Sequence, residues 1–140
     1  MQRRASAQWR GGLKEGQGAV TASSGAFSGM GYSFGTRFED KPGTNPEELI
    51  AAAHAGCFSM ALSAQLGNAG LTPESIETAA NLTMEKQEAG FTITNIHLEV
   101  KAKVPGADNA KFQEAAGNAK KGCPVSRVLN AEITMDAKLV

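Results

Sequence analysis

The sequence has little cysteine and no excess of charge of either sign. Two cysteines in 140 residues are too few for the disulfide framework of a small secreted domain, so any disulfide between them is expected to be transient. Lysine plus arginine and aspartate plus glutamate each number 14, which gives a net charge of zero. Without a global positive field, the chain is not expected to bind nucleic acid.

The sequence also shows no uninterrupted apolar run of the length that crosses a bilayer. A spanning helix needs about 20 mostly apolar residues, and the longest apolar stretches here are Ala-rich helix faces with polar interruptions. Arg3 and Arg4 resemble the start of a twin-arginine signal, but small and polar residues follow them instead of an apolar segment. We therefore expect no membrane partner and a cytoplasmic protein.

What the sequence does contain is typical of an ordinary globular protein. The hydrophobic content is 41% and the charged content is 20%, enough to build a core without disulfide or metal staples. The length and the even composition predict one domain over residues 1–140. No internal repeat or low-complexity segment stands out.

The first third of the chain is predicted to form short strands and loops. Weak alternation predicts two short antiparallel strands within residues 5–24, followed by a flexible Gly- and Ser-rich connection over 24–32. Residues 33–38 are predicted to be a third strand, and 39–43 a turn.

A long helix is predicted to start at Pro46 and to run to about residue 68. Asn45 supplies an N-cap side chain, proline suits the first helical position, and Glu47 and Glu48 favour the positive helix end. Three- and four-residue spacing predicts a buried stripe of Ile50, Ala53, Cys57, Met60, Ala61 and Ala64. Because alanines allow close approach of another surface, the helix is expected to be central.

The remaining chain completes an α+β pattern. Alternation predicts paired strands at 76–85 and 91–104, and a last strand at 131–139. A second helix is predicted over 108–121, and a short one that begins at Pro124. The expected apolar face of the longest strand consists of Phe91, Ile93, Ile96, Leu98, Val100 and Val104.

Local context ranks the two thiols in an order that favours Cys123. Cys57 is predicted in mid-helix among apolar neighbours, where burial raises the pKa of a thiol and leaves it inert packing material. Cys123 precedes the helix-initiating Pro124, where exposed backbone amides favour a thiolate. The alternative is that Cys123 serves only as a weak N-cap.

Two further side chains are candidates for chemistry. Arg37 has Tyr32, Phe34 and Phe38 nearby in sequence, so its guanidinium either rests on an apolar wall and favours an anion, or is an ordinary surface charge. His54 stands three residues before Cys57, but no further ligand has supporting spacing, so packing or a polar contact is favoured over a metal role.

Four blocks resemble one known family: TRF at 36–38, TNPEELI at 44–50, AAHAGCFSMAL at 52–62 and GCPVS at 122–126. In this combination and order the chain resembles the OsmC subfamily of the OsmC/Ohr organic hydroperoxide peroxidases over nearly its full length. The resemblance implies an OsmC-like fold, with antiparallel sheets around long central helices, and an intertwined homodimer with active sites at the subunit interface.

The resemblance also implies a set of site residues. Cys57 would attack the peroxide, Cys123 would resolve the product, and Arg37 and Glu47 would be their polar partners. Glu47 is chosen over Glu48 because it directly follows the proline. This assignment reverses the local ranking of the thiols, so Arg37, oriented by Glu47, is expected to lower the pKa of Cys57. Ten residues of helix separate Glu47 from Cys57 by roughly 15 Å, which a contribution from the second subunit would overcome.

The implied activity is reduction of organic hydroperoxides to alcohols through a Cys57 sulfenic acid and a Cys57–Cys123 disulfide, which an external dithiol reduces. It would serve defence against oxidative or osmotic stress and use no cofactor or metal. The expected apolar approach to the site is formed by Phe34, Phe38, Leu49, Ile50 and Met60. Two alternatives stay open: a module that binds an apolar ligand in the dimer cleft, and a structural stress protein without turnover.

Overall fold

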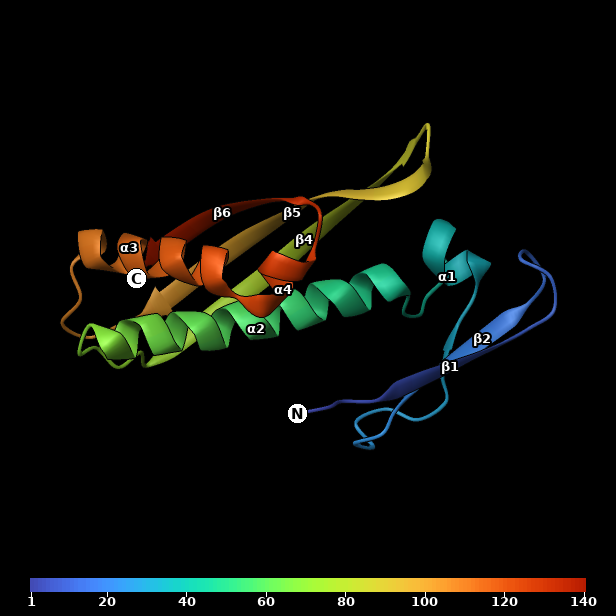
Figure 1. Cartoon of the computed structure of the whole chain (residues 1–140), viewed down its shortest axis with the longest axis horizontal. Helices are drawn as coiled ribbons and strands as arrows, with labels where there is room; N and C mark the ends of the chain where they lie inside the picture. The colour runs from blue at the N-terminus through green and yellow to red at the C-terminus, as the bar shows by residue number, and fades with distance from the viewer. The chain divides into compact units, whose positions relative to one another are not determined.

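The computed structural model describes residues 1–140, which divide into two compact units, Met1–Leu49 and Ile50–Val140. Each unit contains its own three-stranded sheet, and the long helix α2 begins at the end of the first unit and continues into the second. Figure 1 shows the elements in chain order, from blue at the N-terminus to red at the C-terminus.

The first unit is an antiparallel sheet followed by one helical turn. Its strands are β1 (Ala5–Arg10), β2 (Gln17–Ala22) and β3 (Met30–Tyr32), in that spatial order, and the turn is α1 (Phe34–Phe38). The two strands predicted within residues 5–24 are confirmed. The rings of Trp9 and Tyr32 lie 5.5 Å apart across the sheet.

The predicted third strand at residues 33–38 is wrong, because this segment is helical. Ser33 and Thr36 cap it reciprocally: the Thr36 amide donates to Ser33 Oγ at 3.3 Å, and the Ser33 amide donates to Thr36 Oγ1 at 2.9 Å. Such a capping box satisfies amides that a helix start leaves without partners. The third strand instead lies just before this turn, inside the segment predicted to be a flexible connection.

The second unit packs three helices on one sheet. Its elements are α2 (Pro46–Asn68), β4 (Ser75–Gln87), β5 (Gly90–Lys103), α3 (Asn109–Gly122), α4 (Pro124–Val128) and β6 (Glu132–Leu139). β4 and β5 form a long antiparallel hairpin, whereas β6 pairs with β5 in parallel. The expected antiparallel sheet is therefore mixed, because the chain crosses through α3 and α4 before it returns to the sheet.

The core of the second unit lies between the helices and one face of the sheet. Its largest members are Phe58, Leu62 and Leu66 of α2, Phe112 of α3, and Ile96, Leu98 and Val100 of β5. Phe91 was predicted on this face but is 58% exposed. The bulge in the hairpin, where Thr83 pairs with Asn95 but Met84 pairs with Ile93, keeps Ile93 packed against the core. Phe91 pairs with Lys86 beside the hairpin turn, at the end of the strand beyond the core residues, and is therefore exposed.

The predicted buried stripe of α2 is also wrong. The buried residues are His54, Phe58, Leu62 and Leu66, which recur at every fourth position. In the stripe that we expected, Met60 is 78% exposed and Ala61 packs only partly against the core. The bulky residues of α2 fill the core of this unit, and most of the small residues face away from it.

By length and composition alone, α2 is apolar enough to cross a membrane, with a mean hydropathy of 1.4 over 18 residues. The expectation that no segment reaches this length does not hold for this helix. The core helix of a soluble protein passes the same test, so the finding is weak support for a membrane span.

Candidate active site

Two thiols meet where α2 and α4 approach each other. Cys57 lies in the middle of α2, and Cys123 is the residue between the end of α3 and the start of α4. Their Sγ atoms are 2.8 Å apart and share a hydrogen bond, and both cysteines are free. Since a disulfide bond is about 2.05 Å long, the two sulfurs need only a small movement to be joined.

The electrostatic surroundings of Cys57 act in two directions. Burial raises the pKa of its thiol, and the hydrogen bond and charge interaction with Cys123 raise it further, while a hydrogen bond from the Val125 backbone amide lowers it. Within the second unit, this amide is the group that stabilises a thiolate at Cys57.

The same contact bears on the reason for which the sequence favoured Cys123. The sequence places Cys123 beside the exposed amides of a helix start, but its side chain makes no cap hydrogen bond and is completely buried. The amide of Val125 in α4 is directed at Cys57 instead. Sequence neighbours gave no signal of this, because the contact joins residues 68 positions apart.

His54 makes a polar contact, as the sequence favoured. Its side chain is completely buried, its Nε2 lies 2.7 Å from Ser126 Oγ, and its Nδ1 has no hydrogen-bond partner. Burial lowers the pKa of the imidazole, so it is neutral at pH 7. No group of three or more His, Cys, Asp or Glu side chains is arranged to hold a metal ion.

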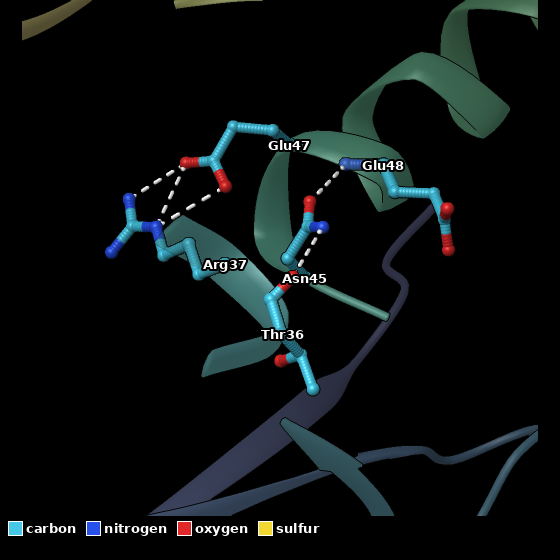
Figure 2. A network of polar contacts seen from close by, with 5 residues as sticks. All are labelled: Thr36, Arg37, Asn45, Glu47 and Glu48. Carbon is cyan, nitrogen blue, oxygen red and sulfur yellow. Dashed lines mark hydrogen bonds and ion pairs between the residues drawn. The ribbon is translucent and has the colours of Figure 1, made fainter. Parts of the chain in front are cut away.

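Arg37 and Glu47 form an ion pair in the first unit (Figure 2). Arg37 Nη2 donates to Glu47 Oε1 at 2.7 Å, and Arg37 Nε donates to Oε1 and Oε2 at 3.1 and 3.2 Å. The side chain of Arg37 is 35% exposed and that of Glu47 is 14% exposed. Because no hydrogen bond is made by Nη1, one edge of a fixed guanidinium remains open to an anion.

Asn45 supports this pair from the start of α2. Its Oδ1 accepts a hydrogen bond from the Glu48 amide at 2.8 Å, which confirms the predicted N-cap. Its Nδ2 donates to the Thr36 carbonyl at 3.1 Å, next to Arg37 (Figure 2). The residue that starts the helix of Glu47 therefore also holds the turn that carries Arg37.

Arg37 rests on an aromatic wall, one of the two alternatives that its sequence context left open. Its Cζ lies 5.0 Å from the centroid of the Phe38 ring, a cation–π distance. A pocket of about 280 Å³ opens here, lined by Trp9, Leu13, Tyr32, Ser33, Phe34, Arg37 and Phe38. Sequence reasoning missed Trp9 and Leu13, because the fold of the β1–β2 hairpin, not sequence proximity, brings them to this pocket.

The family model of OsmC-like proteins matches residues 38–138. Peroxiredoxin OsmC of Escherichia coli is 54% identical over 133 residues, which cover 95% of this chain and 93% of that protein. The chain belongs to the OsmC family.

More distant OsmC relatives agree with this assignment. Organic hydroperoxide resistance protein OhrB of Bacillus subtilis is 34% identical over 103 residues, which cover 72% of this chain and 73% of that protein. The crystal structure of the same relative has a TM-score of 0.69 at 25% identity, over 96% of this chain and 98% of that one. A hydroperoxide resistance protein from Legionella pneumophila shares the fold, with a TM-score of 0.72 at 19% identity over 97% of both chains.

Membership in the OsmC family confirms the resemblance that the four sequence blocks indicated. The match to the solved structures confirms the α+β fold class. The matched segment contains Glu47, Cys57 and Cys123, and Arg37 stands one residue before it.

Proposed function

We propose that this OsmC-family chain is a thiol-dependent peroxidase that reduces organic hydroperoxides to alcohols. The observation that carries the proposal is the 2.8 Å contact between the sulfurs of Cys57 and Cys123. The names of the relatives, peroxiredoxin and organic hydroperoxide resistance protein, support the same activity.

The reaction that this contact supports has two oxidative steps. The Cys57 thiolate attacks one peroxide oxygen, the O–O bond breaks, and the alkoxide leaves with a proton as the alcohol, so that Cys57 becomes a sulfenic acid. The Cys123 thiol then attacks the Cys57 sulfur and releases water, which forms an intramolecular disulfide. An external dithiol returns both residues to thiols and is itself oxidised to a disulfide.

The partly exposed Cys57, and not the fully buried Cys123, is assigned the first attack. A peroxide must reach the attacking sulfur, whereas the resolving sulfur needs only to reach its neighbour. The Val125 amide supports this order because it favours the thiolate of Cys57. Because burial raises the pKa of Cys57, a nearby cation is still needed to stabilise its thiolate at neutral pH. Arg37 is the residue that we propose for this role.

Arg37 has the properties that this role needs. Its guanidinium is held by Glu47 on one edge and by the Phe38 ring on one face, and Nη1 remains open. A fixed donor of this kind stabilises both a thiolate and the negative charge that develops on the leaving oxygen. We assign Glu47 the orientation of Arg37 and Glu48 no catalytic role.

A homodimer with interface active sites is the assembly that we propose. In Met1–Leu49 only Gly16 is buried, and Leu13 is 66% exposed, so this unit leaves apolar surface uncovered. The small side chains of α2 that face away from the core are a second surface suited to close approach. In this dimer Arg37 and Glu47 of one subunit would serve Cys57 of the other.

Mixed dimers test this arrangement. Arg37→Gln and Cys57→Ser chains are each expected to be inactive as homodimers. In the mixed dimer, the intact Arg37 of one chain would face the intact Cys57 of the other, and activity is expected to return at one site per dimer. No recovery on mixing, with dimer exchange verified by mass spectrometry, would contradict a site shared across subunits.

The substrate class follows from the pocket beside Arg37. Its aromatic lining, which includes Phe34 and Phe38, can contact the organic group of an alkyl hydroperoxide. Hydrogen peroxide has no such group and would gain nothing from this lining. We propose an alkyl or lipid hydroperoxide as substrate, oxidative stress defence as the setting and the cytoplasm as the location. The same pocket also favours the alternative of a non-catalytic module that binds an apolar ligand.

Steady-state consumption of cumene hydroperoxide with a dithiol separates the two functions. The wild type is expected to turn over, Cys57→Ser to be inactive, and Cys123→Ser to complete one turnover without forming the intramolecular disulfide. Peptide mass spectrometry without reductant should find one Cys57–Cys123 disulfide after one equivalent of peroxide. Two persistent free thiols, or turnover by Cys57→Ser, would refute the peroxidase.

A further inference from the structure

Three polar contacts connect α2 to the start of α4. The first is the sulfur pair, and the second is the hydrogen bond from the Val125 amide to Cys57. The third joins His54 Nε2 to Ser126 Oγ at 2.7 Å. The proposed peroxidase chemistry uses the first two contacts and leaves the third without a role.

The third contact runs alongside the first. His54 precedes Cys57 by three residues on α2, and Ser126 follows Cys123 by three residues. Residues three apart on a helix share a face, so the imidazole–hydroxyl contact stands one helical turn from the thiol pair along both segments. A contact in this place controls how closely the start of α4 is held against α2.

The backbone amide of Cys123 donates to the Ala119 carbonyl at 2.9 Å and ties the start of α4 to α3, but the rest of this short helix has few contacts that hold it. It contains five residues, none of which is buried, and its N-cap residue Cys123 makes no side-chain cap bond. A helix of this length has little stability of its own. Its position therefore depends on contacts to its neighbours.

His54 is well suited to supply a fixed anchor. It is the one buried polar side chain of the chain and is fully enclosed. Since Nδ1 has no partner, the hydroxyl of Ser126 is the only hydrogen-bond partner of the imidazole. A buried polar group that loses its partner is costly, so the ring and the hydroxyl are strongly favoured to stay together.

We propose that His54 is a positioning residue which, through Ser126, holds Cys123 against Cys57 so that the sulfenic acid is resolved before it is oxidised again. The inference rests on the proposed peroxidase function. Two reactions compete for the sulfenic acid. Attack by Cys123 gives the disulfide and water, whereas attack on a second hydroperoxide gives a sulfinic acid and a second alcohol. Loosening α4 slows the attack by Cys123, and because it also loosens the Val125 amide beside Cys57, the test compares the two products of the sulfenic acid and not the rate of the first oxidation.

The test compares the two products in Ser126→Ala, a change that removes one hydroxyl at the surface of the core. Protein is exposed to increasing cumene hydroperoxide without reductant, and the ratio of Cys57 sulfinic acid to disulfide is measured by peptide mass spectrometry. This ratio does not depend on the rate of the first oxidation. We expect it to rise about five-fold, the factor that one hydrogen bond of ordinary net strength contributes.

Two further variants and a control sharpen the result. Ser126→Thr keeps the hydroxyl, so its ratio of sulfinic acid to disulfide is expected to equal that of the wild type. His54→Gln retains a polar atom near the position of Nε2, so its ratio is expected to lie close to that of the wild type. Ser59→Ala is the matched control, because Ser59 on α2 bonds Thr78 on β4 at 2.9 Å and does not involve α4. It is expected to leave the ratio unchanged.

An unchanged ratio in Ser126→Ala, or an equal rise in Ser59→Ala, would overturn the positioning role. A ratio in Ser126→Thr as high as in Ser126→Ala would overturn it as well, because the hydroxyl would then not be the cause. Failure of the underlying peroxidase function looks different: one equivalent of hydroperoxide would then leave Cys57 of the wild type as a free thiol.

Discussion

Replacing Arg37 by glutamine should raise the pKa of the Cys57 thiol. Burial and Cys123 already raise this pKa within the second unit, and the Val125 amide only partly opposes them. If the guanidinium of Arg37 supplies the missing positive charge, removing that charge while keeping a side chain of similar polarity should make the thiolate less stable.

The magnitude follows from the separation of about 4 to 6 Å at which a cation typically shifts the pKa of a neighbouring group, the separation that the proposed dimer would give Arg37 and the Cys57 thiolate. At a separation of 4 to 6 Å and an effective dielectric constant near 20, Coulomb's law gives about 3 to 4 kcal/mol, or about two to three pKa units. The side chain of Arg37 is 35% exposed and already shared with Glu47, so screening reduces this figure. We therefore expect a rise of about one unit, and about ten-fold less thiolate at pH 7.

The assay is the pH dependence of iodoacetamide alkylation of Cys57 in a Cys123→Ser background, where a single thiol reacts. Arg10→Gln, in the exposed strand β1, removes the same charge elsewhere in the first unit and serves as the control. The rise is also expected to shrink as salt is added, because the charge is partly exposed. An unchanged pKa in Arg37→Gln, or an equal rise in Arg10→Gln, would refute the assignment of Arg37.

Three other predictions follow from single side chains. Glu47→Gln should lower kcat/KM for cumene hydroperoxide about ten-fold while leaving the fold intact by circular dichroism, because one neutral amide replaces a carboxylate that accepts three hydrogen bonds from Arg37; an unchanged kcat/KM would contradict the orienting role of Glu47. Phe58→Ala should reduce the free energy of unfolding in urea by about 3 to 5 kcal/mol, because the ring is fully buried; a loss below about 1 kcal/mol would contradict its place in the core. Burial lowers the pKa of His54, so the unfolded chain binds a proton more readily than the folded one. The contribution of neutral His54 to the free energy of unfolding is therefore fully present above about pH 6.5 and is lost as the pH falls below it. His54→Gln should flatten this decline in the free energy of unfolding, and a pH profile identical to that of the wild type would contradict it.

Local signals were sufficient where neighbouring residues determine the outcome. Asn45, Pro46 and the two acids after them predict the start of α2 correctly, because capping depends on contacts within one turn. The same type of signal is present at Ser33 and Thr36, where a capping box makes a helical turn out of residues whose alternation indicates a strand.

Signals failed where the outcome depends on the partner surface. Which stripe of α2 is buried depends on the shape of the opposing sheet, and the bulky Phe58 fills that space better than the alanines do. Likewise, no pattern near Cys57 indicates that the amide of Val125 is directed at it. The family resemblance named the two cysteines together, and the contact between them became visible only in the folded second unit.

The two functions of Asn45 have a consequence for which sequences this site tolerates. Its side-chain oxygen Oδ1 caps α2, and its side-chain nitrogen Nδ2 donates to the backbone carbonyl of Thr36. Aspartate is normally an equally good cap, but it would present a second oxygen to that carbonyl and repel it. Residues that are interchangeable for starting a helix are therefore not interchangeable here, and drift between asparagine and aspartate would preserve the fold while misplacing the arginine of the site.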